Sequence, residues 1–248
     1  MDSEEFGKYS KEFISDVTAD LSSKQSNFYK NVIFKYPLEG VYIYSFEEGR
    51  MIYADGWEDV VGISSSDISM LGIVNMTCPR FSPFVHDIND KALKFLHTLN
   101  SNLTQYSFTI ETKIMHQNGS EIPVVAKVKV HETFLDGSLK SIMGRFQVDF
   151  GLKFGKIMRY AAYGPEKEKF EADLNTNLFY PYQISLQEAD IISLLTQGQN
   201  KGEIGVQMNQ KSEQIEKRVT DLMKRFDVKN ETHLIAFALE NHLIDSRI

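Results

Sequence analysis

The sequence predicts an α+β protein in which an antiparallel sheet with helices on one face precedes a separate all-α unit of four helices. Three observations lead to this prediction. Short runs between Val41 and Phe150 alternate apolar and polar residues, as strands with one buried face do. Turn signals such as Asn118-Gly119 separate these runs. From Ser185 onward the apolar residues recur at three- and four-residue steps, which is the spacing of amphipathic helices.

Residues 1–37 are predicted to form an amphipathic helical segment. Its apolar residues recur at helical steps and are Phe6, Tyr9, Phe13, Ile14, Val17 and Leu21. Such a stripe either covers its own domain or recruits a partner, so a role in dimer formation stays open.

Residues 38–150 are predicted to form two strands, several short helices and three more strands. The expected strands are Val41–Phe46, Met51–Ala54, Tyr106–Ile114, Val124–Val130 and Ile142–Phe150. Short helices are expected around Trp57 and Leu71, and a longer helix is expected over Ile88–Leu99. An antiparallel meander of this kind with helices packed on one face is an α+β arrangement.

This order of elements resembles the PAS domain. The resemblance rests on Ile52–Gly62, on the Asn118-Gly119 hairpin and on a final strand that runs to Asp149-Phe150. It implies a sensory or dimerisation domain over residues 38–150 and allows a small-molecule ligand in its core. The 17 Phe and 11 Tyr residues of the chain favour a core filled by aromatic side chains.

Three side chains of this domain could hold a cofactor, but their surroundings do not favour one. Cys78 lies in a segment similar to the flavin-binding one of light-sensing PAS relatives, yet Pro79 interrupts the pattern. His86 and His97 lie on the helix from which some PAS relatives ligate haem, but a lone His is more often a surface or hydrogen-bonded residue. No His pair has metal-site spacing with nearby carboxylates or thiols. We therefore expect no cofactor and no metal.

Composition narrows the classes of function. The net charge of −7 argues against indiscriminate binding to nucleic acid or to anionic membranes, so any DNA contact must be local. The single Cys78 excludes an internal disulfide, and no apolar run approaches the length of a membrane span. Phosphate loops, nucleophile elbows and HExxH motifs are absent. We expect a cytoplasmic protein that is not an enzyme.

Residues 151–182 are predicted to link the two domains. Gly164-Pro165 breaks any helix there, and the charged run Glu166–Glu171 is expected to form a short one. The stretch Asn175–Tyr182 is the expected hinge, because it contains Pro181.

Residues 183–248 are predicted to form a helical domain. Ser185 and Glu188 have the spacing of a capping box at a helix start, and Gly198 marks the end of that helix. A second helix carries Ile204 and Met208 inward, and Ser212 is expected to cap a third. The third helix has one apolar face made of Ile215, Val219, Leu222 and Phe226. A fourth follows Asn230, and its small residues Ala236 and Ala238 would allow close approach of a second copy.

The order of these residues resembles the LuxR/GerE-type helix-turn-helix of bacterial regulators. The matching positions are Glu188, Ile191-Ile192, Leu194-Leu195, Gly198, Glu203-Ile204, Met208, Ile215, Val219, Leu222, Arg225-Phe226, Val228 and Asn230. The chain departs from the family pattern at Gln214, Arg218, Asp227 and Glu231. The resemblance implies duplex DNA as partner and a homodimer as the assembly, and the departures put the details of DNA contact in doubt.

The candidate DNA-binding residues lie on the second and third helices of this domain. They are Lys201, Ser212, Gln214, Glu216, Lys217, Arg218, Thr220, Asp221, Lys224 and Arg225. By the resemblance, Glu216, Lys217 and Thr220 face base edges, and a carboxylate there can accept a hydrogen bond from the cytosine amino group. The alternative for Glu216 is an intrahelical pair with Lys217 or Thr220.

Three functions remain open. The first is a transcription regulator that couples the PAS-like domain to a DNA-binding domain. The second is a ligand-binding or protein-interaction module whose helix-turn-helix no longer binds DNA. It is favoured by the eight Lys and Arg against ten Asp and Glu from Tyr180 to Ile248, a net charge of about −2. The third is a sensor with an enzymatic cofactor in the PAS-like core.

Overall fold

The computed structural model describes residues 8–176 and 182–244, which fall into two compact units. The first unit contains the chain up to Leu152 and Met158–Leu174, and the second contains Lys153–Ile157 and the chain from Asn175 onward. The first unit is a sheet covered by helices, and the second is helical. The predicted α+β class, with a PAS-like sheet domain followed by a helical domain, is confirmed.

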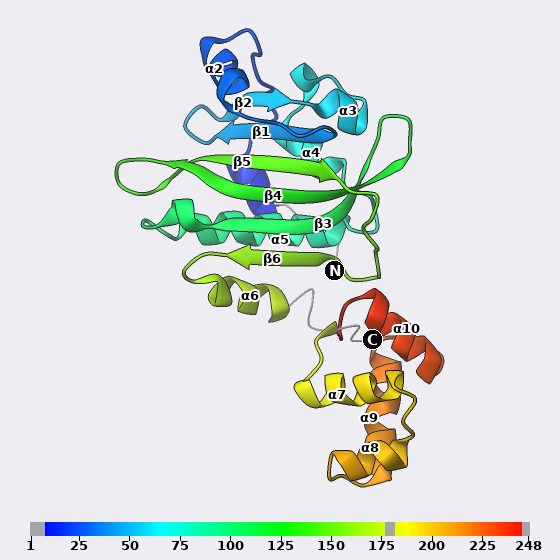
Figure 1. Ribbon diagram of the computed structural model, residues 1–248. Coiled ribbons are helices and arrows are strands. Elements are labelled where there is room, and N and C mark those ends of the chain that lie inside the picture. The colour runs from blue at the N-terminus through cyan, green and yellow to red at the C-terminus, as the bar shows by residue number, and fades with distance from the viewer. Residues whose placement is uncertain (1–7, 177–181, 245–248) are drawn as a thin grey trace. The chain divides into compact units, whose positions relative to one another are not determined.

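Within residues 8–176, six antiparallel strands form one sheet in the order β2-β1-β5-β4-β3-β6 (Figure 1). The strands are β1 (Glu39–Ser45), β2 (Arg50–Asp55), β3 (Ser107–Met115), β4 (Glu121–Thr133), β5 (Leu139–Val148) and β6 (Arg159–Tyr163). All but β6 were predicted. β6 lies in the range predicted to be a linker, and it pairs with β3 so that Phe108 lies opposite Ala162.

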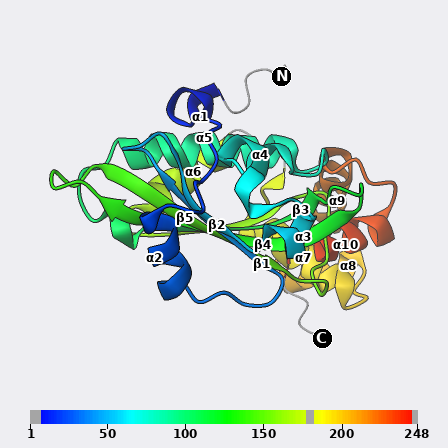
Figure 2. The same ribbon diagram turned by 90° about the horizontal axis from the view of Figure 1, so that it is seen from above.

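Helices cover both faces of this sheet to different extents. They are α1 (Lys8–Phe13), α2 (Lys24–Val32), α3 (Trp57–Val61), α4 (Met70–Asn75), α5 (Ser82–His97) and α6 (Lys167–Thr176), with short 3-10 turns at Ser65–Asp67 and Leu103–Gln105. Figure 2 shows α1, α4, α5 and α6 on one side of the sheet and α2 on the other.

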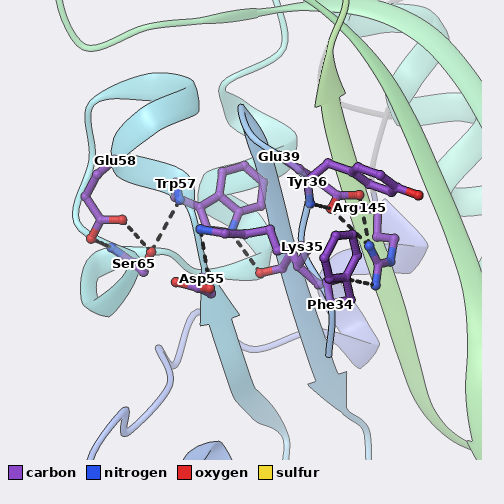
Figure 3. Close-up of polar contacts among 10 residues, drawn as sticks. Phe34, Lys35, Tyr36, Glu39, Asp55, Trp57, Glu58, Ser65 and Arg145 are labelled. Atoms are coloured by element: carbon purple, nitrogen blue, oxygen red, sulfur yellow. Dashed lines mark hydrogen bonds and ion pairs between the residues drawn. The ribbon is translucent and has the colours of Figure 1, made fainter. Parts of the chain in front are cut away.

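Trp57 anchors the start of α3 to the sheet. Its indole Nε1 donates to the carbonyl of Val41 at 3.1 Å (Figure 3). The centroid of its ring lies 5.3 Å from that of Phe146. A Cβ on Gly40 would lie only 3.0 Å from the Trp57 ring, so glycine is the residue that fits there. This packing fixes α3 against β1 with the indole donor satisfied.

A buried ion pair ties the segment before β1 to the sheet. The Glu39 side chain is 5% exposed, and Arg145 Nη1 lies 3.0 Å from its Oε2 (Figure 3). Arg145 Nη2 also donates to the carbonyl of Phe34 at 2.9 Å, and the Tyr36 N–H donates to Glu39. A buried carboxylate needs such partners, because an unpaired charge there would be costly.

The N-terminal segment, predicted to be helical, is helical only in part within the described residues. α1 ends at Phe13, and the chain then runs alongside β2, where the Met51 N–H donates to the Val17 carbonyl at 3.0 Å. Arg50 adds a hydrogen bond to the Thr18 carbonyl at 2.9 Å. Pairing with the edge strand supplies partners for its exposed backbone groups, and this outweighs the helical spacing. Phe6 lies outside the described residues.

The range predicted to be a linker contains structure that belongs to the sheet unit. In α6, Phe170 is 2% exposed and packs against Phe95 and Phe108, with ring centroids 5.7 and 4.9 Å away. Lys91 of α5 donates to the carbonyl of Asp173 at 2.9 Å. Of the predicted hinge, residues 177–181 lie outside the described residues.

Four helices make up the second unit within residues 182–244. They are α7 (Leu186–Thr196), α8 (Lys201–Gln207), α9 (Ser212–Arg225) and α10 (Glu231–Glu240). The predicted capping box starts α7, because Glu188 N–H donates to Ser185 Oγ and Ser185 N–H donates to Glu188 Oε2. A second box, not predicted, starts α8 with Asn200 and Glu203. The core contains the predicted apolar face of α9.

Two half-buried histidines, His97 and His131, make the stability of the sheet unit depend on pH. Burial lowers the pKa of His97 and of His131 below the ordinary 6.5, because a low-dielectric site disfavours the imidazolium form. The unfolded chain then binds more protons as pH falls through 6.5. The stability that these two neutral histidines contribute is therefore at its full value above pH 6.5 and decreases as the pH falls below it.

We expect the free energy of unfolding to fall between pH 7.5 and pH 5.5, and to fall less in His131→Gln than in the wild type. Trp57 is the single tryptophan, so its fluorescence follows the unfolding of the sheet unit. His233→Gln, an exposed change in the second unit, is the matched control and should leave the pH dependence of this transition unchanged. An equal loss in the wild type and His131→Gln would contradict the assignment for His131.

Candidate nucleic-acid interface

A tight turn between α8 and α9 builds the candidate interface. The Gln210 N–H donates to the Gly205 carbonyl at 2.8 Å, and Asn209 takes a positive φ of 53°. A Cβ on Gly205 would lie 2.7 Å from the Gln210 carbonyl oxygen, closer than real contacts allow. The missing side chain lets the turn fold back on α8, and this places α9 across it as in a helix-turn-helix.

The apolar face of α9 is fully used inside the unit, so the opposite face is left for a partner. Ile215, Val219 and Leu222 are at most 1% exposed. Lys217 and Lys224 lie seven positions apart on the opposite face, and both are exposed. In the part of the chain that the structure describes, neither lysine forms an ion pair. Glu213 and Asp221 share this face, so its charges alternate in sign.

Two predicted contact residues on one flank of α9 are held by α7. Arg218 Nη1 donates to Gln187 Oε1 at 2.7 Å, and Arg225 Nη2 lies 3.1 Å from Glu188 Oε1. Partial burial opposes ionisation of Glu188, but hydrogen bonds from Ser185 and the charge of Arg225 outweigh it and lower the pKa of this carboxyl. A phosphate must therefore compete with existing partners for both arginines.

The other flank of α9 contains a cluster that we call the Lys201 cluster, made of Lys201, Glu216 and Glu231. Lys201 Nζ lies 2.7 Å from Glu231 Oε1 and 3.6 Å from Glu216 Oε1. The hydrogen bond to Glu231 is the main cause of a raised pKa for Lys201. The ion partner of Glu216 is therefore Lys201 of α8. The sequence had left open an intrahelical pair with Lys217 or Thr220 instead.

The start of α9 differs by one residue from the prediction. The cap residue is Lys211, with extended backbone at φ −73° and ψ 144°, and Ser212 is the first helical residue. The Gln214 side chain compensates, because its Oε1 accepts from the Lys211 N–H at 3.1 Å. Ser212 and Gln214 are exposed, and Thr220 is half-buried. The ten candidate residues thus lie on α8 and α9, but four of them, Lys201, Glu216, Arg218 and Arg225, already have side-chain partners.

A second candidate site is a cavity of about 80 Å³ in the sheet unit. Its walls are α4, α5, the inner face of the sheet and Ile14 from the N-terminal segment. The lining is mostly aliphatic, including Met70, Leu71, Leu93 and Ile142. The expectation of an aromatic-filled core therefore needs correction: of the Phe, Tyr and Trp side chains, Tyr42 and Phe108 line this space, and they leave a void.

The residues considered for cofactors have ordinary surroundings. His86 lines the cavity, where its Nε2 lies 3.2 Å from Ser82 Oγ. His97 packs between Phe13 and Phe46, with ring centroids 4.5 and 5.6 Å away. Cys78 is buried, and its Sγ lies 3.2 Å from Glu121 Oε1. No group of three metal-ligating side chains occurs among the described residues.

A search for membrane-spanning helices covered residues 8–176 and 182–244. None of the helices there has the length and apolar character that crossing a membrane requires.

Comparison with known proteins gave structural matches only. No family model and no curated protein matches the sequence. A phage VqmA–DPO complex is 13% identical, with 88% of this chain and 90% of that chain covered and a TM-score of 0.33. The Vibrio cholerae VqmA dimer, described as a LuxR-type receptor, is 10% identical, with 90% of each chain covered and a TM-score of 0.34. A PAS domain from Colwellia psychrerythraea is 12% identical, with 51% of this chain and 98% of that chain covered and a TM-score of 0.38.

These matches are to proteins of the two kinds that the sequence resembles. The VqmA structures extend over most of this chain, and the Colwellia domain over about half of it. With TM-scores below 0.5 they establish no function for it, so the functional argument depends on the residues themselves.

The partners of three candidate DNA-binding side chains, Arg218, Arg225 and Lys201, were not predicted from the sequence. Gln187, Glu188 and Glu231 lie 31, 37 and 30 positions from the arginine or lysine that each one binds. Glu188 was recognised as a cap, and Glu231 only as a departure from a family pattern. Pairs between separate helices have no local spacing signal, so only the packed structure brings them together.

The turn itself can be tested with Gly205→Ala. We expect a loss of about 1–3 kcal/mol in the free energy of unfolding of the helical unit, because the Gln210 backbone must move to admit the Cβ. Circular dichroism at 222 nm during urea unfolding measures it. Gly202→Ala, at an exposed position of the same helix, is the control and should change stability by less than about 1 kcal/mol. Equal effects of the two changes would contradict the steric role of the turn.

The cavity can be tested with xenon, since dry apolar cavities bind it. We expect xenon to bind the full-length protein and Ala92→Leu to abolish binding, because Ala92 lines the cavity and the larger side chain fills it. Xenon-129 chemical shifts report the bound state. Ala172→Leu, on an exposed position of α6, is the matched control and should bind as the wild type does. Binding that survives in Ala92→Leu would place the xenon elsewhere.

Proposed function

We propose that this chain is a cytoplasmic, non-enzymatic transcription regulator that binds duplex DNA through α8 and α9. In this proposal the PAS-like unit is sensory or dimerising, its cavity accepts a small apolar ligand, and the working form is a homodimer. The observation that supports DNA binding most directly is the outward line of Lys217 and Lys224 on a helix whose opposite face is wholly buried.

The dimensions of α9 suit the DNA major groove. Its 14 residues span about 21 Å at 1.5 Å per residue. The major groove of B-DNA is about 12 Å wide and admits a single helix. With α9 in the groove, Lys217 lies toward the base edges with Glu216 and Thr220 beside it, and the long side chains of Lys217 and Lys224 bring their charges close to the phosphates that flank the groove.

Charge is distributed in a way that supports local DNA contact despite an acidic total. Glu188 and Glu231 are engaged by Arg225 and Lys201. Pairing reduces the repulsion that these two carboxylates exert on phosphates, so the charges that a phosphate meets on the outer face of α9 are those of Lys217 and Lys224 together with Glu213 and Asp221.

One observation favours the rival function of a protein-interaction module. Glu213 and Asp221 alternate with Lys217 and Lys224 along the outer face, which is typical of a solvated helix or of a helix that binds another protein. Salt dependence separates the two functions, because phosphate contacts release counterions and a mixed-charge protein contact does not.

Helix α10 has fewer residues available for a dimer contact than the sequence suggested. Ala238 is fully buried inside the unit, so it cannot lie against a second copy. Leu239 is 36% exposed and Ala236 is half-buried, and these residues remain available on α10. We propose that any dimer contact of this helix uses them.

Lys217→Gln and Lys224→Gln test the DNA contact. Each should weaken binding to every duplex sequence and reduce the slope of log K against log salt by about 0.9, because one phosphate contact releases about one counterion. Fluorescence anisotropy of a labelled duplex from 50 to 200 mM salt measures both quantities.

Lys127→Gln is the control for this experiment, because Lys127 is an exposed lysine on the sheet of the other unit. It should leave affinity and slope unchanged. Wild-type binding that does not respond to salt, or slopes that stay the same in both α9 variants, would favour the interaction module instead.

A further inference from the structure

The Lys201 cluster joins three helices through one ammonium group. Lys201 is the first residue of α8, Glu216 lies on a flank of α9, and Glu231 is the first residue of α10. The side chain of Lys201 is 28% exposed, that of Glu216 is 62% exposed and that of Glu231 is 40% exposed. The cluster therefore contains one cation and two carboxylates beside the outward face of α9.

The two carboxylates do not share Lys201 equally. The distance to Glu231 is 2.7 Å, which is a hydrogen-bonded ion pair, whereas the distance to Glu216 is 3.6 Å, which is a looser electrostatic contact. Glu216 is also the more exposed of the two. The Glu216 carboxylate can therefore still accept a hydrogen bond from a partner in solution. Lys201 neutralises mainly the charge of Glu231.

We propose that Glu231 is a positioning residue that determines DNA sequence preference by binding the ammonium group of Lys201, so that Lys201 makes only a looser contact with Glu216. This inference rests on the proposed function. With Glu231 in place, Glu216 presents a carboxylate that can accept from the amino group of cytosine. Without it, Lys201 turns to Glu216 as its remaining partner, and the acceptor is neutralised and occupied.

Two properties of DNA binding should change together in Glu231→Gln. Discrimination at the base pair that Glu216 reads falls by about fivefold or more, which is the lower end of the range for one specific base contact. Affinity for non-specific duplex rises by about two- to fivefold, because one negative charge near the phosphates is lost. A merely structural role for Glu231 would lower the affinity for all sequences and leave the base preference intact.

The experiment selects bound sequences from a pool of random duplexes with the full-length wild type, Glu231→Gln, Glu231→Asp and Glu216→Gln. We expect Glu231→Gln and Glu216→Gln to lose preference at the same base pair, and Glu231→Asp to retain it, because the shorter carboxylate still binds Lys201. Lys201→Gln should keep the preference, since Glu216 is then unoccupied, and should bind non-specific duplex more weakly.

The outcomes are distinguishable from a failure of DNA binding itself. A wild-type consensus that is unchanged in Glu231→Gln but altered in Glu216→Gln would overturn the positioning role and leave the regulator intact. Loss of preference at a base pair other than the one altered in Glu216→Gln would also overturn it. No enrichment and no salt-dependent binding by the wild type would overturn the proposed function and this inference together.

Discussion

The close approach of the Gln210 carbonyl to Gly205 is the contact on which the helix-turn-helix depends. A helix that enters a groove must bury one face and present the other, and here the turn decides which face is buried. Because no side chain intervenes, α9 crosses α8 closely enough for Ile215 to be fully buried. The outward direction of Lys217 follows from that burial, since it lies two positions from Ile215, nearly opposite on the helix.

The neighbours of each cation decide whether it can reach a phosphate. Net charge alone suggests a weak nucleic-acid binder, with a total of about −2 from Tyr180 onward. The structure divides the cationic side chains on and around α9 into two sets. Arg218, Arg225 and Lys201 are bound to α7 or α10, where exposed pairs add only modest stability. The lysines on the outer face of α9 have no such partner among the described residues. An acidic domain can thus present two outward lysines, although Glu213 and Asp221 on the same face offset part of their charge.

Local patterns predicted most elements of this protein, and long-range pairings account for the differences. The strand alternation and the caps at Ser185 and Gly198 depend on residues near one another in sequence, so they were visible. β6 was not, because five residues with no clear alternation form a strand only when β3 offers an edge about 50 positions away. The extended path after Phe13 has the same cause, since β2 supplies the partner. The cap at Lys211 instead of Ser212 is a local error, for both residues are compatible with the turn and the Gln214 side chain decides between them.

The cavity is explained by where the aromatic residues lie. Two groups of aromatic rings reach the cavity, one with Trp57, Phe146 and Tyr42 and the other with Phe95, Phe108 and Phe170, and Tyr42 and Phe108 line it. Between them the walls are mainly aliphatic, and branched aliphatic side chains of fixed rotamer cannot close every gap between a twisted sheet and straight helices. At about 80 Å³ the space is roughly half of an engineered cavity that holds benzene, which is about 150 Å³. A ligand larger than a few heavy atoms must therefore displace wall side chains. Met70 is the most adaptable of these, because methionine has three rotatable bonds. Recognition would then depend on a rearrangement near α4 and α5, and the small resting volume sets an energetic cost that selects against bulky ligands.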